Sequence, residues 1–251
     1  MKPTLRLFAA ALTILLVFTA VGARAGDDAP GLEEFPVRHG DLSSPKIAIT
    51  MDDVNEPEWV WKCVELCEQY GIAMTFFPNG VNMKEEDREK WQAVVDSGCE
   101  IGSHGYYHER FKDNGWQVLY NLGLFEEQVD KVLGYHYEVR WFRPTWGTIE
   151  DSNGSMYKNM TLIKRCGYSH ILLWNVSETD PKKAIKQVKN GGILLYHARK
   201  KDYECLETLI PQLLDAGFEP VTVSELFDFD PPETSGELFV YDGDTYGRIQ
   251  E

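Results

Sequence analysis

The sequence predicts an α/β protein built around a parallel sheet. Between residues 46 and 228, seven short apolar segments alternate with amphipathic segments of helical length. The short segments are apolar along most of their length, which is typical of strands covered on both faces, as the strands of parallel sheets are. This alternation fits an open doubly wound sheet and a closed barrel equally well.

The seven expected strands are, in order, KIAITM (46–51), AMTFFP (73–78), CEIGSH (99–104), VRWFRP (139–144), SHILLWNV (169–176), GILLYHA (192–198) and EPVTVSELF (219–227). Helices are expected between them at 57–71, 84–98, 121–134, 154–167, 180–191 and 203–217. Pro57 and Pro181 stand at helix starts and a glycine closes each helix, in agreement with the preferences of helix caps.

The N-terminal residues 1–25 have the pattern of a secretory signal peptide. Two basic residues precede an apolar run (7–21), and ARA at 23–25 has the small residues of a cleavage site. The run is shorter than the roughly 20 residues of a membrane-spanning helix, so we expect no stable membrane insertion. We therefore expect cleavage after Ala25 and a secreted, periplasmic or cell-envelope location.

The rest of the chain divides into three parts. Residues 26–45 have the composition of a linker, residues 46–228 form one domain, and residues 229–251 form a C-terminal tail with one possible strand at 237–241. The formal net charge is −15, and loss of the three basic residues of segment 1–25 takes it to about −18. Because such a surface repels polyanions, we expect no nucleic-acid partner.

Polar side chains gather where the expected strands end. The residues at these ends are Asp52, Asp53, His104, Arg143, Asp180 and His197. In a parallel α/β fold the carboxyl ends of the strands meet on one face, where loops build the active site. Five separate segments would therefore deliver ionisable groups to one rim.

Part of this set has the composition of a metal site. His104 and His108 lie four residues apart, and with one carboxylate they make the His₂-carboxylate set expected of catalytic zinc. Successive side chains of a strand point to opposite faces, so one of Asp52 and Asp53 can bind a metal while the other faces the substrate. That second carboxylate would accept the proton of an attacking water.

The remaining strand ends supply the other groups that a hydrolase needs. Arg143 would hold the second carboxylate ionised and oriented. His197 comes from a different strand and is suited to protonate a leaving nitrogen or oxygen, with Asp180 as its acidic partner. Base, acid and metal ligands are then all present.

Five segments in this order, ITMDDV, SHGYYH, FRPTWG, WNVSETD and LLYH, resemble the five motifs of the polysaccharide deacetylase family, which are carbohydrate esterases with a NodB-like homology domain. The resemblance covers about residues 46–228. It implies a distorted, incomplete (β/α) barrel with about seven parallel strands. It also implies a zinc ion, or another divalent transition metal, and the removal of N- or O-acetyl groups from polymers such as chitin, peptidoglycan or xylan.

The resemblance assigns roles around the metal. Asp52 matches the catalytic base, and Asp53 matches a metal ligand. His104 and His108 match the other two ligands.

The resemblance also assigns the groups around the substrate. Arg143 is expected to orient Asp52, and the backbone N–H of Trp146 to stabilise the tetrahedral oxyanion. Asp180 matches the acid that tunes the catalytic histidine, which is His197. Near the expected rim, Tyr106 and Trp174 are candidates for stacking on sugar rings, as are Tyr107 and Trp146.

Four positions depart from the family pattern. Val54 replaces a glycine, Gly105 a hydroxyl residue, Ser177 an acid and Pro181 a tryptophan. These departures bear on substrate and rate more than on reaction class, because the ligands, the base and the acid are all present.

The sequence thus predicts a secreted, metal-dependent hydrolase that removes acetyl groups from an acetylated polysaccharide or oligosaccharide. Two alternatives remain open. One is a C–N hydrolase acting on a small amide or cyclic ureide, and the other is a non-catalytic glycan-binding protein on the same fold.

Overall fold

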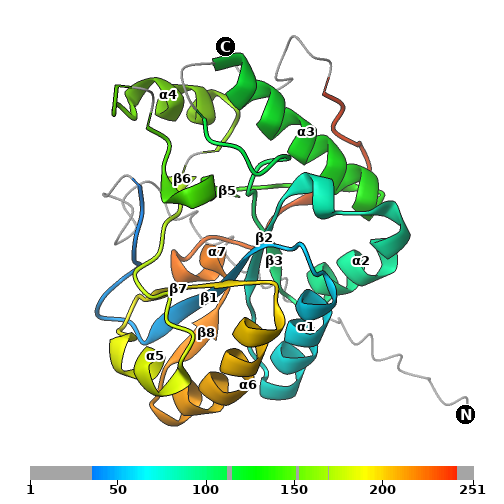
Figure 1. The fold of residues 1–251 in the computed structure, drawn as a ribbon. Coiled ribbons are helices and arrows are strands. Elements are labelled where there is room, and N and C mark those ends of the chain that lie inside the picture. The colour runs from blue at the N-terminus through cyan, green and yellow to red at the C-terminus, as the bar shows by residue number, and fades with distance from the viewer. Residues whose placement is uncertain (1–35, 112–114, 151–152, 169, 242–251) are drawn as a thin grey trace, which may run out of the picture.

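The computed structural model describes residues 36–111, 115–150, 153–168 and 170–241. Its centre is a parallel sheet formed by β3 (Glu100–Ile101), β2 (Thr75–Pro78), β1 (Lys46–Asp53), β7 (Ile193–His197) and β8 (Glu219–Val221), which pairs with the first residues of β1 (Figure 1). A second parallel pair joins β5 (Trp141–Phe142) to β6 (His170–Ile171). In the described part of the chain these seven strands are the seven that the sequence predicts, in the same order.

Isolated bridges connect the two sheets into an incomplete barrel. Ser103, just after β3, pairs with Phe142 of β5, and Val176, beyond β6, pairs with Leu194 of β7. The order around the barrel is therefore β7, β1, β2, β3, β5, β6 and back to β7. The alternative of an open doubly wound sheet is excluded, and the predicted distorted barrel is confirmed.

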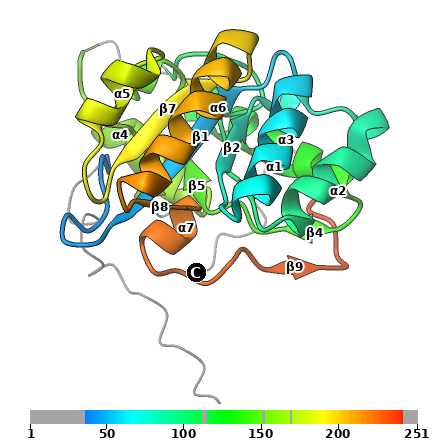
Figure 2. The same ribbon diagram turned by 90° about the horizontal axis from the view of Figure 1, so that it is seen from below.

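Helices cover the outside of the barrel. The helices are α1 (Glu58–Tyr70), α2 (Arg88–Asp96), α3 (Gly115–Leu133), α4 (Tyr157–Arg165), α5 (Pro181–Gln187), α6 (Lys200–Asp215) and α7 (Val223–Leu226), with short 3₁₀ turns η1 (Gly80–Asn82), η2 (Glu85–Asp87) and η3 (Thr145–Gly147). Seen from below, α1 and α6 lie side by side over the outer face of β1, β2 and β7 (Figure 2). No helix in the described residues is long and apolar enough to cross a membrane.

The pattern of α1 illustrates why these segments fold as helices against the sheet. Val60, Val64 and Cys67 recur at helical spacing and are buried, so one face of the helix packs on the core. Gly71 ends the helix at φ 64°, and its N–H donates to the carbonyl of Cys67. A left-handed residue at this position is favourable for glycine, which has no Cβ.

Some boundaries differ from the predicted ones. The last strand was expected over 219–227, but β8 ends at Val221, and Thr222 then caps α7 by accepting the N–H of Glu225 on its side chain. The hydroxyl of Thr222 caps the first turn of a helix. The chain therefore becomes helical after β8, although its β-branched residues favour a strand. α3 begins at Gly115 and α6 at Lys200, both earlier than predicted.

The segments that flank the domain pack against it. Val37 is fully buried and exchanges backbone hydrogen bonds with Ile171 and Leu173 beside β6. In the tail, β9 (Thr234–Ser235) pairs antiparallel with β4 (His136–Tyr137).

The strand expected at 237–241 does not form, because Phe239 donates its N–H to the carboxylate of Asp130 on α3 instead. The predicted signal peptide, residues 1–25, lies outside the described residues.

Candidate active site

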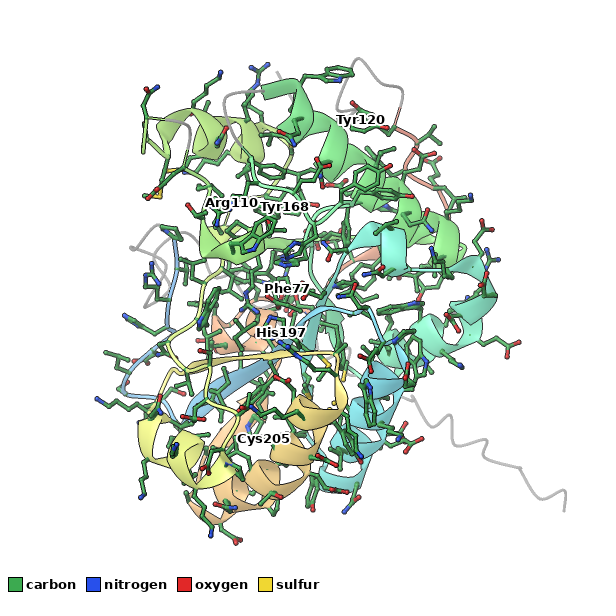
Figure 3. All side chains as sticks on the ribbon, in the orientation of Figure 1. Phe77, Arg110, Tyr120, Tyr168, His197 and Cys205 are labelled. Carbon is green, nitrogen blue, oxygen red and sulfur yellow. The ribbon has the colours of Figure 1, made fainter. Side chains whose placement is uncertain are left out.

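The carboxyl ends of the strands open into a cleft of about 710 Å³, within the range of about 300–1,000 Å³ that ligand sites occupy. Among the predicted residues, the cleft is lined by Asp52, Asp53, His104, His108, Trp146, Trp174 and His197. Asp52 and His197 are directly paired in the β1–β7 register, so the carboxyl ends of the two strands lie side by side. Figure 3 labels His197 near the centre of the molecule.

The three predicted metal ligands converge. Asp53 Oδ1 lies 3.3 Å from His104 Nε2 and 3.4 Å from His108 Nε2. All three ligand atoms lie within 4.8 Å of one another. Zinc bonds of about 2.0–2.1 Å at tetrahedral angles place neighbouring ligand atoms roughly 3.3–3.4 Å apart. The two separations from Asp53 are therefore compatible with a metal ion of this size bound between the three side chains.

The two histidines turn their Nε2 atoms toward Asp53. His104 Nδ1 lies 2.7 Å from the carbonyl of Arg143, and this hydrogen bond orients the ring with Nε2 toward Asp53. Burial lowers the pKa of His108 below its ordinary value, despite the opposing effect of Asp53. Neutral imidazoles are the form that metal ions bind.

Asp53 provides an independent test of the fit. Its Oδ1 is buried and receives no hydrogen bond from the described residues, and a buried carboxylate oxygen without a donor is costly unless a cation is bound. Burial alone would raise the pKa of Asp53, but His104, His197 and His108 outweigh it and hold the pKa below its ordinary value. The residues present therefore fit a divalent metal ion.

The backbone of β1 separates the two aspartates. Asp53 and Val54 both have left-handed φ values, 68° and 59°. The chain thus turns sharply after Asp52, and the two carboxylates enter different parts of the cleft. Val54 is fully buried. This β-branched residue stands where the family pattern has glycine, and its left-handed backbone conformation costs about 1–2 kcal/mol.

Asp52 is paired with a fully buried arginine. Arg143 donates from one guanidinium nitrogen to Asp52 Oδ1 at 2.8 Å and to the hydroxyl of Thr50 at 2.6 Å. Its other nitrogens face the carbonyls of Leu172 and Leu173 at 3.4 and 3.3 Å. Burial lowers the pKa of Arg143, and the adjacent Asp52 opposes that shift. Arg143 thus pairs with Asp52, the residue that the sequence analysis expects it to orient.

The predicted acid pair, His197 and Asp180, is not brought together in the same way. Asp180 does not line the cleft, and its carboxylate caps α5 by accepting the N–H of Lys182. Asp202 on α6 contacts the histidine directly: it is buried, lines the cleft and accepts the backbone N–H of His197 at 3.1 Å. Sequence reasoning missed Asp202. The only available signal was its position five residues after His197, at the start of a helix.

The aromatic residues have different positions. Trp146 is 52% exposed at the rim, and its ring lies 4.3 Å from that of His108. No acceptor among the described residues takes up the backbone N–H of Trp146. Trp174 also lines the cleft. Tyr106 does not, because its half-buried ring packs against Gly80.

A second residue that sequence reasoning missed holds the loop between the two histidines. The amide oxygen of Asn121 accepts the N–H groups of Tyr106 and Tyr107 at 2.6 and 3.3 Å, and its nitrogen donates to the carbonyl of Tyr107. Gly105 has φ 78°, and a Cβ there would lie 2.4 Å from Asn121 Oδ1. Glycine at position 105, in place of the hydroxyl residue of the family pattern, therefore leaves room for Asn121 of α3 to bond to the loop.

An incomplete barrel with a possible Asp–His–His ligand set at the carboxyl ends of its strands has the groups that a hydrolase needs. The Polysaccharide deacetylase family model matches residues 39–164, and the chain belongs to this family.

Three relatives cover most of this chain. An uncharacterized protein of Bacillus subtilis, YlxY, is 25% identical over 207 residues, 78% of this chain and 62% of that protein. A bifunctional xylanase/deacetylase of Pseudobutyrivibrio xylanivorans is 29% identical over 72% of this chain, which spans 30% of that protein. A peptidoglycan-N-acetylglucosamine deacetylase of Bacillus cereus is 28% identical, with 73% of this chain and 88% of that protein covered. The chain thus spans less than two thirds of the first two.

Among solved structures, a CE4 family pseudoenzyme from Bacillus anthracis aligns with a TM-score of 0.68 at 21% identity, covering 78% of this chain and 71% of that one. This similarity concerns the fold alone. It agrees with the barrel described above.

Proposed function

We propose that this protein is an exported, divalent-metal-dependent deacetylase that hydrolyses acetyl groups on a polysaccharide, with zinc as the first candidate metal. The observation that carries the proposal is the convergence of Asp53, His104 and His108 next to the Asp52–Arg143 pair. The proposed proton acceptor and one of the proposed ligands then lie at the same end of one strand. Relatives named as a peptidoglycan-N-acetylglucosamine deacetylase and a bifunctional xylanase/deacetylase support the substrate class.

The proposed chemistry divides between the bound metal and the side chains. A divalent cation held by Asp53, His104 and His108 would polarise the acetyl carbonyl and lower the pKa of the attacking water. Asp52 takes the proton of this water as general base, because Arg143 keeps its carboxylate fixed at the end of β1. The N–H of Trp146 is available to stabilise the negative charge that develops on the carbonyl oxygen.

The leaving group is protonated from the other side of the β1–β7 pair. His197 lies opposite Asp52 in the register and lines the cleft. We propose that its imidazolium gives a proton to the departing amine or sugar hydroxyl, so that acetate is released and the histidine becomes neutral. Asp202 holds the backbone of His197 in place.

Acetate release tests the proposal. The purified protein is assayed on chitin oligomers, peptidoglycan and acetylated xylan, before and after removal of metal with a chelator and again after zinc is added back. We expect acetate from at least one polymer, loss with the chelator and recovery with zinc. Turnover of a small amide without acetate from any polymer would favour the C–N hydrolase alternative. Glycan binding without any turnover would favour the non-catalytic alternative.

A further inference from the structure

Three of the five cysteines gather between α1 and the start of β3, away from the cleft. Cys63 and Cys67 lie one turn apart on the buried face of α1, and Cys99 immediately precedes β3. All three belong to one hydrophobic core and are at most 4% exposed. The five cysteines are free thiols in this structure. The proposed deacetylation uses none of them.

The backbone brings the end of α1 close to the start of β3. Ile72 donates its N–H to the carbonyl of Cys67, so the chain turns directly from α1 toward β2. Just before β2, the carbonyl of Met74 accepts the N–H of Glu100, the first residue of β3. The last turn of α1 and Cys99 are thus held on the same side of this pair of strands.

Cys67 and Cys99 are the two thiols in direct contact. Their side chains hydrogen-bond to each other, whereas among the described thiols Cys63 lies near Cys99 without such a bond. The bond, together with burial, raises the pKa of Cys67 well above its ordinary value. It lowers the pKa of Cys99, although burial opposes that shift. Cys99 is therefore the thiol that ionises more readily, and the thiolate is the nucleophilic form of cysteine.

Cys99 is also the thiol that a reagent can reach. It lines a cavity of about 280 Å³ beside the first residue of β3, whereas Cys63 and Cys67 do not line this cavity. Tyr137 and residues of the segment 229–232, which follows α7, form its other walls. A reagent that enters the cavity therefore meets Cys99 first, with Cys67 enclosed behind it.

The three thiols do not form a metal site. A metal ion needs three ligand atoms close to one another, and within the described residues only the group at the cleft, Asp53, His104 and His108, has its ligand atoms within 4.8 Å. The pair Cys67–Cys99 is thus the unit that is available for thiol chemistry.

We propose that Cys67 and Cys99 are a redox pair that closes to a disulfide and ties the end of α1 to the start of β3. The oxidant is a disulfide-bearing compound or protein of an oxidising compartment. The Cys99 thiolate attacks one sulfur of this disulfide and releases the other half as a thiol. Cys67 then loses its proton and attacks the Cys99 sulfur, which forms the new bond and releases the second half as a thiol. Two electrons and two protons pass from the pair to the oxidant.

The disulfide stabilises the fold mainly by restraining the unfolded chain. It closes a loop of about 30 residues that contains β2 and α2. For a domain of this length we expect oxidation to raise the Tm by about 5–10 °C. The pair lies at the opposite end of the strands from the ligand set, so its oxidation does not require deacetylation.

Thiol counting and peptide mapping test the inference. The purified, zinc-loaded protein is reduced with a phosphine, freed of reductant and incubated with glutathione disulfide. In a second arm, the reduced chain is refolded in the presence of the same oxidant. Remaining thiols are then alkylated under denaturing conditions. We expect the number of free thiols to fall from five to three, a linked peptide that contains Cys67 and Cys99, and a rise in Tm that the phosphine reverses.

Single changes separate the roles of the two cysteines. In Cys67→Ser, Cys99 should stay joined to one glutathione, because no second thiol completes the exchange. In Cys99→Ser, the enclosed Cys67 should stay reduced. The matched control is Cys166→Ser, since Cys166 is equally buried but lies outside the group; this variant should still form the Cys67–Cys99 link.

Five free thiols in both arms contradict the inference, and so does a linked peptide in which Cys63 takes the place of Cys67. A Cys67–Cys99 link in either arm supports it, whether or not the protein releases acetate, so the inference and the proposed function can fail separately. Because the link is read from the unaltered protein, a variant that does not fold leaves this result unchanged.

Discussion

Asp52 and Asp53 are consecutive in the chain, but their carboxylates belong to different halves of the site. Asp52 Oδ1 is 2.8 Å from the guanidinium of Arg143, whereas Asp53 Oδ1 faces His104 and His108. The left-handed φ of Asp53 and of Val54 produces this division. One strand end thus supplies both the proton acceptor and the ligand oxygen.

Because the two carboxylates have different partners, we predict that mutations can separate the role of Asp52 from that of Asp53. Asp52→Asn removes the proton acceptor but leaves the three ligands, so acetate release should fall by roughly 10²–10⁴-fold with one zinc still bound per chain. Zinc content and acetate release are measured on the same preparation. His104→Ala is the matched change on the other half and should lose the metal. Unchanged turnover in Asp52→Asn would show that another group is the base.

The acid that supports His197 can be identified by comparing two changes. Asp202→Leu removes the acceptor of the backbone N–H of His197 and should lower kcat by about ten- to a hundredfold, the range expected when a catalytic group is displaced. Asp180→Asn keeps the helix cap, because asparagine caps as well as aspartate, and should change kcat little. The reverse ranking would restore Asp180 as the tuning residue that the sequence predicts.

Asn121 is predicted to act on metal binding through the ligand loop. Asn121→Leu removes the acceptor for two N–H groups of this loop and should weaken zinc binding by about ten- to a hundredfold. Asn159→Leu is the matched control, since Asn159 is equally buried but bonds to Phe111 and Ile149. Both changes should lower the free energy of unfolding by about 1–3 kcal/mol. An equal loss of zinc affinity in the two variants would make the role of Asn121 merely structural.

The buried carboxyl of Glu100, at the opposite end of the barrel, should make the free energy of unfolding depend on pH. Burial raises the pKa of Glu100 in the folded chain, against hydrogen bonds from Ser224 and Thr75. For a carboxyl with a raised pKa, the stabilisation is fully present below the unfolded pKa of about 4.3 and is lost as pH rises through the folded pKa. The difference in free energy of unfolding between the unaltered protein and Glu100→Gln should therefore fall as pH rises.

Denaturant titrations of both proteins between pH 4.5 and 8 measure this difference. Glu100→Gln keeps the size of the side chain and cannot ionise, so it is the reference. A difference that grows with pH would mean that Glu100 is held ionised in the folded chain.

The succession of strands and helices and the gathering of polar residues at the strand ends could be predicted because both depend on local patterns, whereas the choice of Asp53 over Asp52 as the expected ligand came from the family resemblance. Apolar segments separated by capped helices specify the alternation, and a polar residue at a strand end specifies the rim. His104, His108 and Asp53 are close because β2 alone separates β1 from β3 in the parallel barrel.

Other features depend on contacts between distant segments. Asp202 reaches His197 only because α6 begins directly after β7, and Asn121 reaches the ligand loop from a helix that starts earlier than its apolar pattern indicates. Tyr106 has the composition of a rim residue, but Gly80 provides a surface for its ring on the inner side of the loop. The positions of these side chains are determined by tertiary packing, which a single sequence does not reveal.

The central claim is that one metal ion is bound by Asp53, His104 and His108. Crystals of the zinc-loaded protein, measured at the zinc absorption edge, test it most directly. We predict one anomalous peak in the cleft, about 2.0–2.2 Å from the three ligand atoms. A peak elsewhere, or no peak although the crystals were grown with zinc, would contradict it.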